Sequence, residues 1–281
     1  MADTLFRRVT IIGVGLIGGS LGLALRHKKI VDKVVGIVRR KSSLEKVLES
    51  KAVEEATCDF SEGIGRSEIV IVAIPVATII EQIKSIIPFV KPGTVITDVG
   101  SVKAEVVYAV EKILPKGVFF VGGHPLAGSE KSGVENARTD LFDKTICVLT
   151  TTPKTNPLAL RKVRDLWEGL GVEVRLLSPN EHDLVLARTS HLSHLTAFAL
   201  VSILERGDES FVAAGFRDTT RIASSNALIW RDIFLANRKA VLKSFKGFES
   251  YLEKISDLIE RKEKDKLLQE LEKIQSRREK L

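Results

Sequence analysis

The sequence predicts an α/β fold, with a doubly wound Rossmann-type domain followed by an all-α domain. In the first half, short β-branched runs alternate with segments of helical periodicity, which is typical of a parallel sheet covered by helices. A glycine-rich turn over residues 13–19 joins the first of these runs to the first helix. After Pro179 the strand pattern stops and the chain is helical. We therefore expect a first domain over residues 1–178 and a helical domain over residues 179–281.

The composition is that of a globular protein with a sizeable core. Of the 281 residues 44% are hydrophobic, and 43 basic against 36 acidic residues give a formal charge of +7. The basic residues are dispersed among acids, so we expect no nucleic-acid partner, although a positive cleft would attract an anionic substrate. The longest apolar region, residues 9–25, is broken by five glycines, and no signal peptide or membrane contact is expected. Cys58 and Cys147 are expected to be buried free thiols, and the protein to be cytoplasmic.

The predicted elements follow this division. Strands are expected over residues 9–12, 34–38, 69–74, 94–98, 118–121, 145–149 and 172–176, and helices over residues 20–26 and 156–170. In the second half, a long apolar helix is expected over residues 181–204, then a break at 207–215, and helices from residue 227 onward. Because a helix that is apolar around much of its circumference is normally buried, the first of these predicts the centre of the helical domain or a subunit interface.

The glycine-rich turn predicts a dinucleotide site. Gly13, Gly15 and Gly18 form the G-x-G-x-x-G pattern, with a strand before it and a helix after it. Gly13 suits the tight turn, Gly15 lets the backbone approach a pyrophosphate, and Gly18 lets helix and strand pack closely. Such turns also occur for packing reasons alone, but the strand and helix favour the cofactor. The expected contacts are Gly13, Val14, Gly15, Leu16, Ile17 and Gly18.

The end of the second strand favours NADP over NAD. Val38 is followed by Arg39, Arg40, Lys41, Ser42 and Ser43, where an NAD site usually has an acid for the ribose hydroxyls. Arg39, Arg40 and Ser43 suit a 2′-phosphate, and the alternative is a solvated basic loop. Ala73, Ile74 and Pro75 end the strand over residues 69–74, at the edge where a nicotinamide ring would lie.

The segment over residues 122–133, GGHPLAGSEKSG, holds the candidate base. Its glycines and proline predict a turn, so His124 is expected just beyond the strand over residues 118–121, on irregular backbone. A histidine titrates near neutral pH and suits general-base catalysis. Ser101 follows the neighbouring strand at the same edge, either as a ligand contact or as a helix N-cap.

The helical half offers two further pairs. His191 and His194 are three residues apart and share a helix face, which favours substrate contact or a buried structural role over a metal site, because further ligands are absent from the pattern. Arg217 and Arg221 are four apart and suit a carboxylate, unless they pair with Asp218 on the helix surface.

Four motifs together closely resemble the prephenate/arogenate (cyclohexadienyl) dehydrogenase family of tyrosine biosynthesis, from about residue 9 to about residue 248. They are the glycine turn and residues 98–103, 122–130 and 215–221. The resemblance implies oxidative decarboxylation of prephenate or arogenate, with His124 as general base and Ser101 orienting the substrate hydroxyl and the nicotinamide. It also implies a homodimer through the helical domain, and substrate contacts by Arg221, His194, Glu130, Arg217 and Trp230. No metal is expected, because the residue pattern supplies no complete ligand set.

Two positions depart from the family pattern. Many members have proline where Ser193 stands, and many NAD-using members have aspartate where Val38 stands. Neither a chorismate mutase domain nor an ACT domain is expected. Two alternatives remain: a β-hydroxyacid dehydrogenase, which would use a lysine of the helical half, and a non-catalytic nucleotide-binding protein. The choice between prephenate and arogenate stays open at this point.

Overall fold

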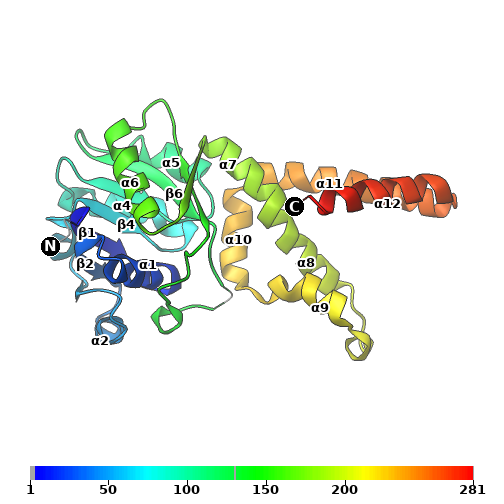
Figure 1. Cartoon of the computed structure of the whole chain (residues 1–281), viewed down its shortest axis with the longest axis horizontal. Coiled ribbons are helices and arrows are strands. Elements are labelled where there is room, and N and C mark those ends of the chain that lie inside the picture. Colours follow the sequence, from blue (N-terminus) through cyan, green and yellow to red (C-terminus); the bar gives the residue numbers. More distant parts are fainter. Residues whose placement is uncertain (1–3, 130, 281) are drawn as a thin grey trace.

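The computed structural model describes residues 4–129 and 131–280 (Figure 1). Within those residues the first half forms an eight-stranded sheet of order β3-β2-β1-β4-β5-β6-β7-β8. Every neighbouring pair is parallel except β6 and β7. The strands are β1 (Phe6–Ile12), β2 (Val31–Ile37), β3 (Glu55–Thr57), β4 (Ile69–Val72), β5 (Val95–Asp98), β6 (Phe119–Pro125), β7 (Ile146–Thr150) and β8 (Glu173–Leu177).

Helices cover both faces of this sheet, as a doubly wound fold requires (Figure 1). One apolar cluster joins the sheet to α1 and α6, and a second joins it to α4 and α5. The predicted fold class is therefore confirmed. The helices are α1 (Leu16–His27), α2 (Leu44–Glu49), α3 (Phe60–Ile64), α4 (Val76–Ile86), α5 (Ala104–Val110) and α6 (Pro157–Gly169), with 3₁₀ turns η1 (Lys41–Ser43), η2 (Ile87–Phe89) and η3 (Val134–Asn136).

The turn predicted at Gly122 and His124 is wrong, because both residues belong to strand β6. The first part of β6 pairs in parallel with β5, from Phe119 to Val121. From Gly122 onward it pairs antiparallel with β7 instead, so that His124 lies opposite Val148. The hydrogen bonds to β7 supply the order that the glycines do not favour by themselves. His124 therefore lies on regular, buried backbone rather than on a loop.

Two other expectations needed correction. Helix α1 begins at Leu16, four residues before the predicted start, with Gly15 at its N-cap. Cys58 is partly exposed, whereas Cys147 is buried as expected. Strand β3 was not predicted, because three residues at a sheet edge carry too short a pattern to recognise.

The helical half begins with a long, bent helical run. The predicted helix over 181–204 is α7 (Pro179–Leu186) and α8 (Leu192–Ser202), joined by a π-helical turn, η4 (Ala187–His191). The other elements are η5 (Asp208–Phe211), α9 (Ala214–Thr220), η6 (Arg221–Ser224), α10 (Ala227–Ala236), α11 (Arg238–Glu260) and α12 (Lys264–Arg278). Strand β8 ends at Leu177, and the division at residue 178 stays a prediction.

The run from Pro179 to Ser202 spans 24 residues and, by length and composition, is apolar enough to cross a membrane. Its buried residues include His182, Asp183 and His191, all of which form hydrogen bonds inside the protein. These buried polar residues lie in α7 and η4, where internal hydrogen bonds are typical of a folded domain, whereas in α8 only Ala197 is buried.

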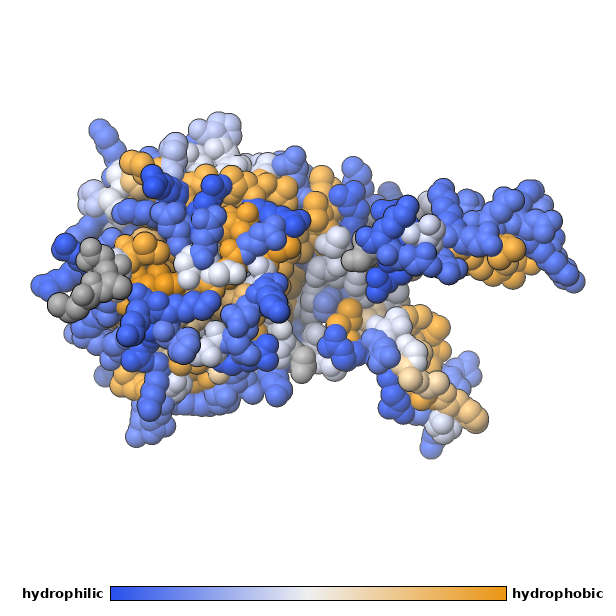
Figure 2. Space-filling view, viewed as in Figure 1, coloured by the Kyte–Doolittle hydropathy of each residue, from blue (hydrophilic) through white to orange (hydrophobic). Residues whose placement is uncertain are grey.

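The helical half contacts the first half through α10. Trp230 and Ile233 join the same apolar cluster as Ile79 and Ile83 of α4. Beyond this contact, two projections extend away from the sheet, one formed by α8 and α9 and the other by α11 and α12 (Figure 1). Apolar side chains are visible on both projections in Figure 2. The exposed large apolar residues of the helical half are Val201, Ile203 and Phe211, then Leu228, Ile229 and Leu235 of α10, and Leu242, Leu252, Ile259, Leu268, Leu271 and Ile274 of α11 and α12.

Candidate active site

The carboxyl ends of four strands bring the predicted site residues of the first half to one edge. The register pairs Ile12 with Val72, and Val72 with Asp98, so the segments that follow these residues start at the same level of the sheet. The glycine turn follows β1, Ala73 follows β4, Ser101 follows β5, and His124 lies near the end of β6. This is the edge at which open α/β sheets bind their ligands.

The glycine turn has the shape that a dinucleotide needs. Gly13 has φ +91°, and a Cβ there would lie 2.5 Å from the carbonyl oxygen of Ala73. A Cβ on Gly18 would lie 2.1 Å from the carbonyl oxygen of Gly13. A Cβ on Gly15 would meet nothing within 4 Å, so the space beside the α1 N-terminus is open. Free backbone N–H groups at that terminus fit a pyrophosphate.

The segment after β2 carries two cations, Arg39 and Arg40, that are accessible to an anionic ligand. Val38 is 7% exposed and belongs to the core, whereas Arg39 and Arg40 are exposed. Within residues 4–129 and 131–280, neither arginine forms an ion pair with a carboxylate. Ser43 ends the η1 turn and is half-buried. These residues form an anion-compatible surface at the carboxyl end of β2.

His124 is the first member of a buried hydrogen-bonded chain. Its Nδ1 atom lies 2.8 Å from Nε2 of His182, and Nδ1 of His182 lies 2.8 Å from Oδ1 of Asp183. An ionised Asp183 accepts from Nδ1–H of His182, which leaves Nε2 of His182 as an acceptor for Nδ1–H of His124. The lone pair on Nε2 of His124 is then the one available to a ligand.

Asp183 is held by the start of helix α5. Its Oδ1 accepts from the backbone N–H of Lys103 at 2.8 Å, and its Oδ2 from that of Ala104 at 2.9 Å. The carboxylate of α7 thus satisfies the N-terminal donors of α5. Ser101 is not the N-cap, because Lys103 occupies that position and α5 starts at Ala104.

Burial favours the neutral form of the two hydrogen-bonded histidines, His124 and His182. Burial lowers the pKa of His124 well below its ordinary value, and the nearby His182, Lys103 and His191 lower it further. The pKa of His182 is also lowered by burial, against the opposing effect of Asp183. A neutral imidazole at the sheet edge can accept a proton, which is the state that a general base requires.

The helical half supplies a cluster of aromatic rings, formed by Trp230, His191 and His194. The rings of His194 and Trp230 stack with centroids 3.5 Å apart, and His191 contacts the same tryptophan edge to face. Nδ1 of His191 accepts from the side-chain amide of Asn237 at 3.1 Å, and that amide also donates to the backbone carbonyl of Asp183 at 2.8 Å. His191 is therefore a structural histidine, whereas His194 is partly exposed.

The two predicted arginines are on different elements, and Arg221 is the one shown to lie near His194. Arg217 is in α9 and Arg221 begins the η6 turn, and both are exposed. The charge of Arg221 contributes to lowering the pKa of His194, after the larger effect of burial. The part of the chain that the structure describes contains no ion pair from Asp218 to either arginine. Glu130 lies outside the described residues.

Three site residues escaped the sequence reasoning: His182, Asp183 and Asn237. The adjacent His182 and Asp183 on an apolar helix were a usable signal, since polar residues inside an apolar segment must find partners when buried. Asn237 gave none, because it lies at an ordinary junction between two helices.

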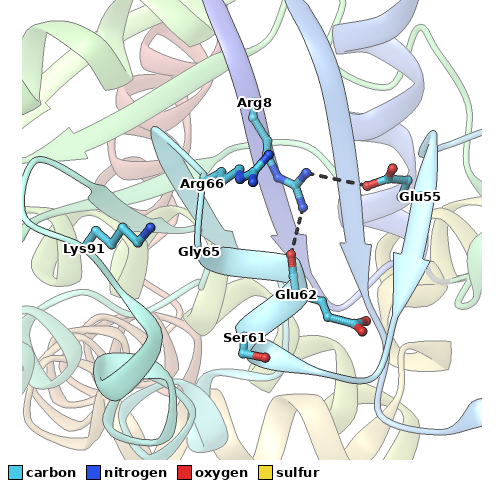
Figure 3. Close-up of a pocket in the computed structure, with 7 residues that line it drawn as sticks. All are labelled: Arg8, Glu55, Ser61, Glu62, Gly65, Arg66 and Lys91. Atoms are coloured by element: carbon cyan, nitrogen blue, oxygen red, sulfur yellow. Dashed lines mark hydrogen bonds and ion pairs between the residues drawn. The ribbon is translucent and has the colours of Figure 1, made fainter.

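A separate pocket lies at the opposite, amino-terminal edge of the sheet (Figure 3). Its lining is charged, but Arg8 is engaged with the carboxylate of Glu55 at 3.6 Å and with the carbonyl oxygen of Glu62 at 2.9 Å. These internal pairs hold α3 and β3 against β1. The hydrogen-bonded histidines lie at the other edge of the sheet, the carboxyl-terminal edge that also carries the glycine turn.

A Rossmann-type domain with a dinucleotide turn, a neutral buried histidine and an adjoining helical domain defines a nicotinamide-dependent dehydrogenase. Family models match nearly the whole chain: the nucleotide-binding domain of prephenate dehydrogenase over residues 21–176, and its dimerization domain over residues 178–273. The chain belongs to the prephenate dehydrogenase family. It is an NAD(P)-dependent oxidoreductase for the oxidative decarboxylation of prephenate, arogenate or both.

Individual relatives agree with this assignment. Prephenate dehydrogenase of Bacillus subtilis is 34% identical, over 95% of this chain and 73% of that protein. The crystal structure of prephenate dehydrogenase from A. aeolicus, in complex with hydroxyphenyl propionate and NAD+, superposes with a TM-score of 0.92 at 35% identity, covering 100% of this chain and 99% of that one. Synechocystis arogenate dehydrogenase gives 0.85 at 30% identity, covering 97% and 99%.

Proposed function

We propose that His124 is the general base of this reaction, acting on the C4 hydroxyl of the cyclohexadienyl ring. The observation that carries the proposal is the buried chain from His124 through His182 to Asp183. NAD(P) bound at the glycine turn would accept the hydride from C4. As the C4 carbonyl forms, the hydroxyl proton passes to Nε2 of His124. When carbon dioxide leaves C1, the electron pair of the broken bond moves through the ring to the C4 oxygen, which takes up a proton, and the ring becomes aromatic.

The chain supports this role in two ways. It fixes the tautomer, so that Nε2 of His124 carries the free lone pair. It also provides for the positive charge that develops on His124, because the imidazolium can donate to His182, which is oriented by the carboxylate of Asp183. The charge is thus stabilised without opening the site to water.

The remaining site residues surround this base. Ser101, half-buried after β5, would orient the C4 hydroxyl and the nicotinamide. Arg221 would bind a substrate carboxylate, with His194 contacting the substrate side chain and Arg217, Trp230 and Glu130 lining the pocket. The exposed guanidinium of Arg221 beside His194 supports this arrangement.

NADP is proposed as the preferred cofactor. Arg39 and Arg40 are exposed and unpaired with carboxylates among the described residues, and the side chain of Val38 offers no acceptor for a ribose hydroxyl. A 2′-phosphate would find two guanidinium groups there. The A. aeolicus relative was solved with NAD+, so this segment is where the two enzymes are expected to differ.

The test is one kinetic grid of two substrates by two cofactors. Purified protein is assayed for nicotinamide reduction and carbon dioxide release with prephenate or arogenate and with NAD or NADP. We expect turnover, with a higher kcat/KM for NADP than for NAD. Absence of turnover in all four combinations would contradict the proposed activity, and a preference for NAD would contradict the cofactor proposal alone.

A homodimer in the cytoplasm is proposed as the working form. The exposed apolar residues of the helical half (Figure 2) are more than a soluble monomer usually leaves uncovered, and all of those named above except Ile274 lie in the segment that matches a dimerization domain. Light scattering with size-exclusion chromatography measures the mass, for which a value of twice 31.0 kDa is expected. A monomer at micromolar concentration would contradict this.

A further inference from the structure

A buried ion pair between Asp98 and Lys103 lies next to the strand segment that carries His124, and it has no role in the reaction proposed above. The side chains of Asp98 and Lys103 are both 0% exposed, and the ammonium group contacts Oδ2 of Asp98 directly. Removing two charges from water costs free energy. Their mutual attraction offsets this cost only when further hydrogen bonds satisfy the remaining donors of the ammonium group and the remaining acceptors of the carboxylate. The partners of the pair are therefore informative.

Those partners are the two segments that carry the catalytic candidates. Nζ of Lys103 donates to the carbonyl oxygen of Gly123 at 2.8 Å, and Oδ1 of Asp98 accepts from the N–H of the same glycine at 3.2 Å. The pair thus holds both backbone groups of the residue before His124. Oδ2 of Asp98 also accepts from the N–H of Gly100 at 2.9 Å, next to Ser101.

Lys103 also reaches the far end of the histidine chain. Its backbone N–H donates to Oδ1 of Asp183, the oxygen that also contacts His182. One residue therefore fixes the strand that carries His124 through its side chain and the carboxylate that orients His182 through its backbone. Both ends of the hydrogen-bonded chain are therefore held by Lys103, which follows strand β5.

Glycines make room for this arrangement. A Cβ on Gly100 would lie 2.8 Å from Oδ2 of Asp98, and one on Gly123 would lie 2.7 Å from the carbonyl oxygen of Asp98. On Gly122 it would lie 2.6 Å from Oγ1 of Thr150 and 3.4 Å from Cδ of Lys103. Side chains at these positions would move the strand away from the ion pair. The two glycines before His124 thus allow close packing rather than a turn.

We propose that Asp98 and Lys103 are positioning residues that fix His124 relative to Ser101. This proposal rests on the role of His124 proposed above. The ammonium group holds the Gly123 carbonyl, and its positive charge disfavours protonation of the neighbouring imidazoles. The titratable groups around His124 are His182 and Asp183 of α7, His191 of η4, Cys147 of β7, and Asp98 and Lys103.

Two variants test the pair. Lys103→Met removes the ammonium and leaves Asp98 charged, whereas the double variant Asp98→Asn with Lys103→Met is neutral and of similar volume. Neutral replacement of a buried ion pair is often tolerated by the fold, so the double variant is expected to fold. Because a displacement of about 1 Å can cost roughly 100-fold in rate, kcat is expected to fall about 100-fold in both. KM for the dinucleotide should stay within about twofold, since the glycine turn is untouched.

A pH profile separates positioning from simple stabilisation. In Lys103→Met the acidic limb of kcat/KM should move to higher pH, because a positive charge next to the base has been removed. Thr10→Val is the matched control: Thr10 is also 0% exposed and hydrogen-bonded to the carbonyl oxygen of Gly63, but it lies in β1, two strands away from the β5 strand that carries Asp98. It should lower thermal stability without changing kcat or the acidic limb.

The proposal is overturned if the folded double variant keeps the kcat of the parent enzyme, or if folded Lys103→Met keeps the acidic limb of the parent enzyme. It is also overturned if both variants fail to fold, because the pair would then be required by the fold rather than by the site. Failure of the proposed function looks different: the parent enzyme would lack turnover, or His124→Asn would keep full activity.

Discussion

Nδ1 of His124 lies 2.8 Å from Nε2 of His182, and this contact joins strand β6 of the sheet to helix α7 of the helical half. His124 therefore belongs to one half of the molecule and its hydrogen-bonding partner to the other. A change in how the halves pack would alter the surroundings of His124, the proposed base. The expected consequences can be measured.

His124→Asn should lower kcat by about 10²- to 10⁴-fold and leave KM for substrate little changed. The reason is that the base contributes as the C4 carbonyl forms, not when the substrate binds. Steady-state kinetics with the better substrate and cofactor of the grid measures this. The variant should keep its affinity for the dinucleotide, and an unchanged kcat would remove His124 from the mechanism.

His182→Leu should lower kcat more than His182→Gln. Leucine leaves the Nδ1–H of His124 without an acceptor in a buried site, whereas a glutamine carbonyl can replace the lost Nε2. We expect a loss of about tenfold or more for leucine and a partial rescue by glutamine. If the two variants have equal kcat values, the hydrogen bond between His124 and His182 does not contribute to kcat.

Arg221→Ala should raise KM for the substrate by about tenfold or more, because a charged hydrogen bond to a carboxylate is lost. Arg231→Ala is the matched control, since Arg231 is also an exposed arginine of the helical half but pairs with Asp232 at 2.6 Å. Initial rates over a range of substrate concentrations give both values. Equal saturation curves for the two variants would refute the carboxylate role of Arg221.

Replacing Arg39 and Arg40 together by alanine should raise KM for NADP by about tenfold or more and change KM for NAD little. The guanidinium groups are proposed to meet the 2′-phosphate, which NAD lacks. NAD in the same enzyme is the internal control. Parallel losses with both cofactors would mean that the two arginines serve the fold or the pyrophosphate instead.

Stability should fall as the pH drops from about 6.5 to about 4. Burial lowers the pKa of His191 from 6.5 to about 4, so in that window the unfolded chain binds a proton that the folded chain does not. The contribution is complete above about 6.5 and lost as the pH falls through about 4. His191→Phe should flatten the slope of the free energy of unfolding against pH, measured by urea denaturation, whereas the exposed-site variant His27→Gln should not. An unchanged slope in His191→Phe would contradict the buried, neutral state of this histidine.

The sequence by itself determined the fold class, the glycine turn and the family. Buried parallel strands read as continuous apolar runs, and a G-x-G-x-x-G turn needs specific residues at specific positions, so both leave local patterns. His124 and Arg221 entered through motifs of the same local kind. The long apolar helix was also recognisable, although its π turn at Ala187–His191 was not.

The tertiary structure decided what surrounds His124. Its strand continues to Pro125 only because β7 pairs with it, and residues 58 positions apart in the chain make its hydrogen bond to His182. The hydrogen bonds from the ion pair of Asp98 and Lys103 to Gly123 likewise depend on the register that places β5 beside β6. Hydrogen bonds between distant segments leave no periodicity in a sequence. His124 could therefore be recognised as a candidate base from the sequence, but the groups that contact it could not.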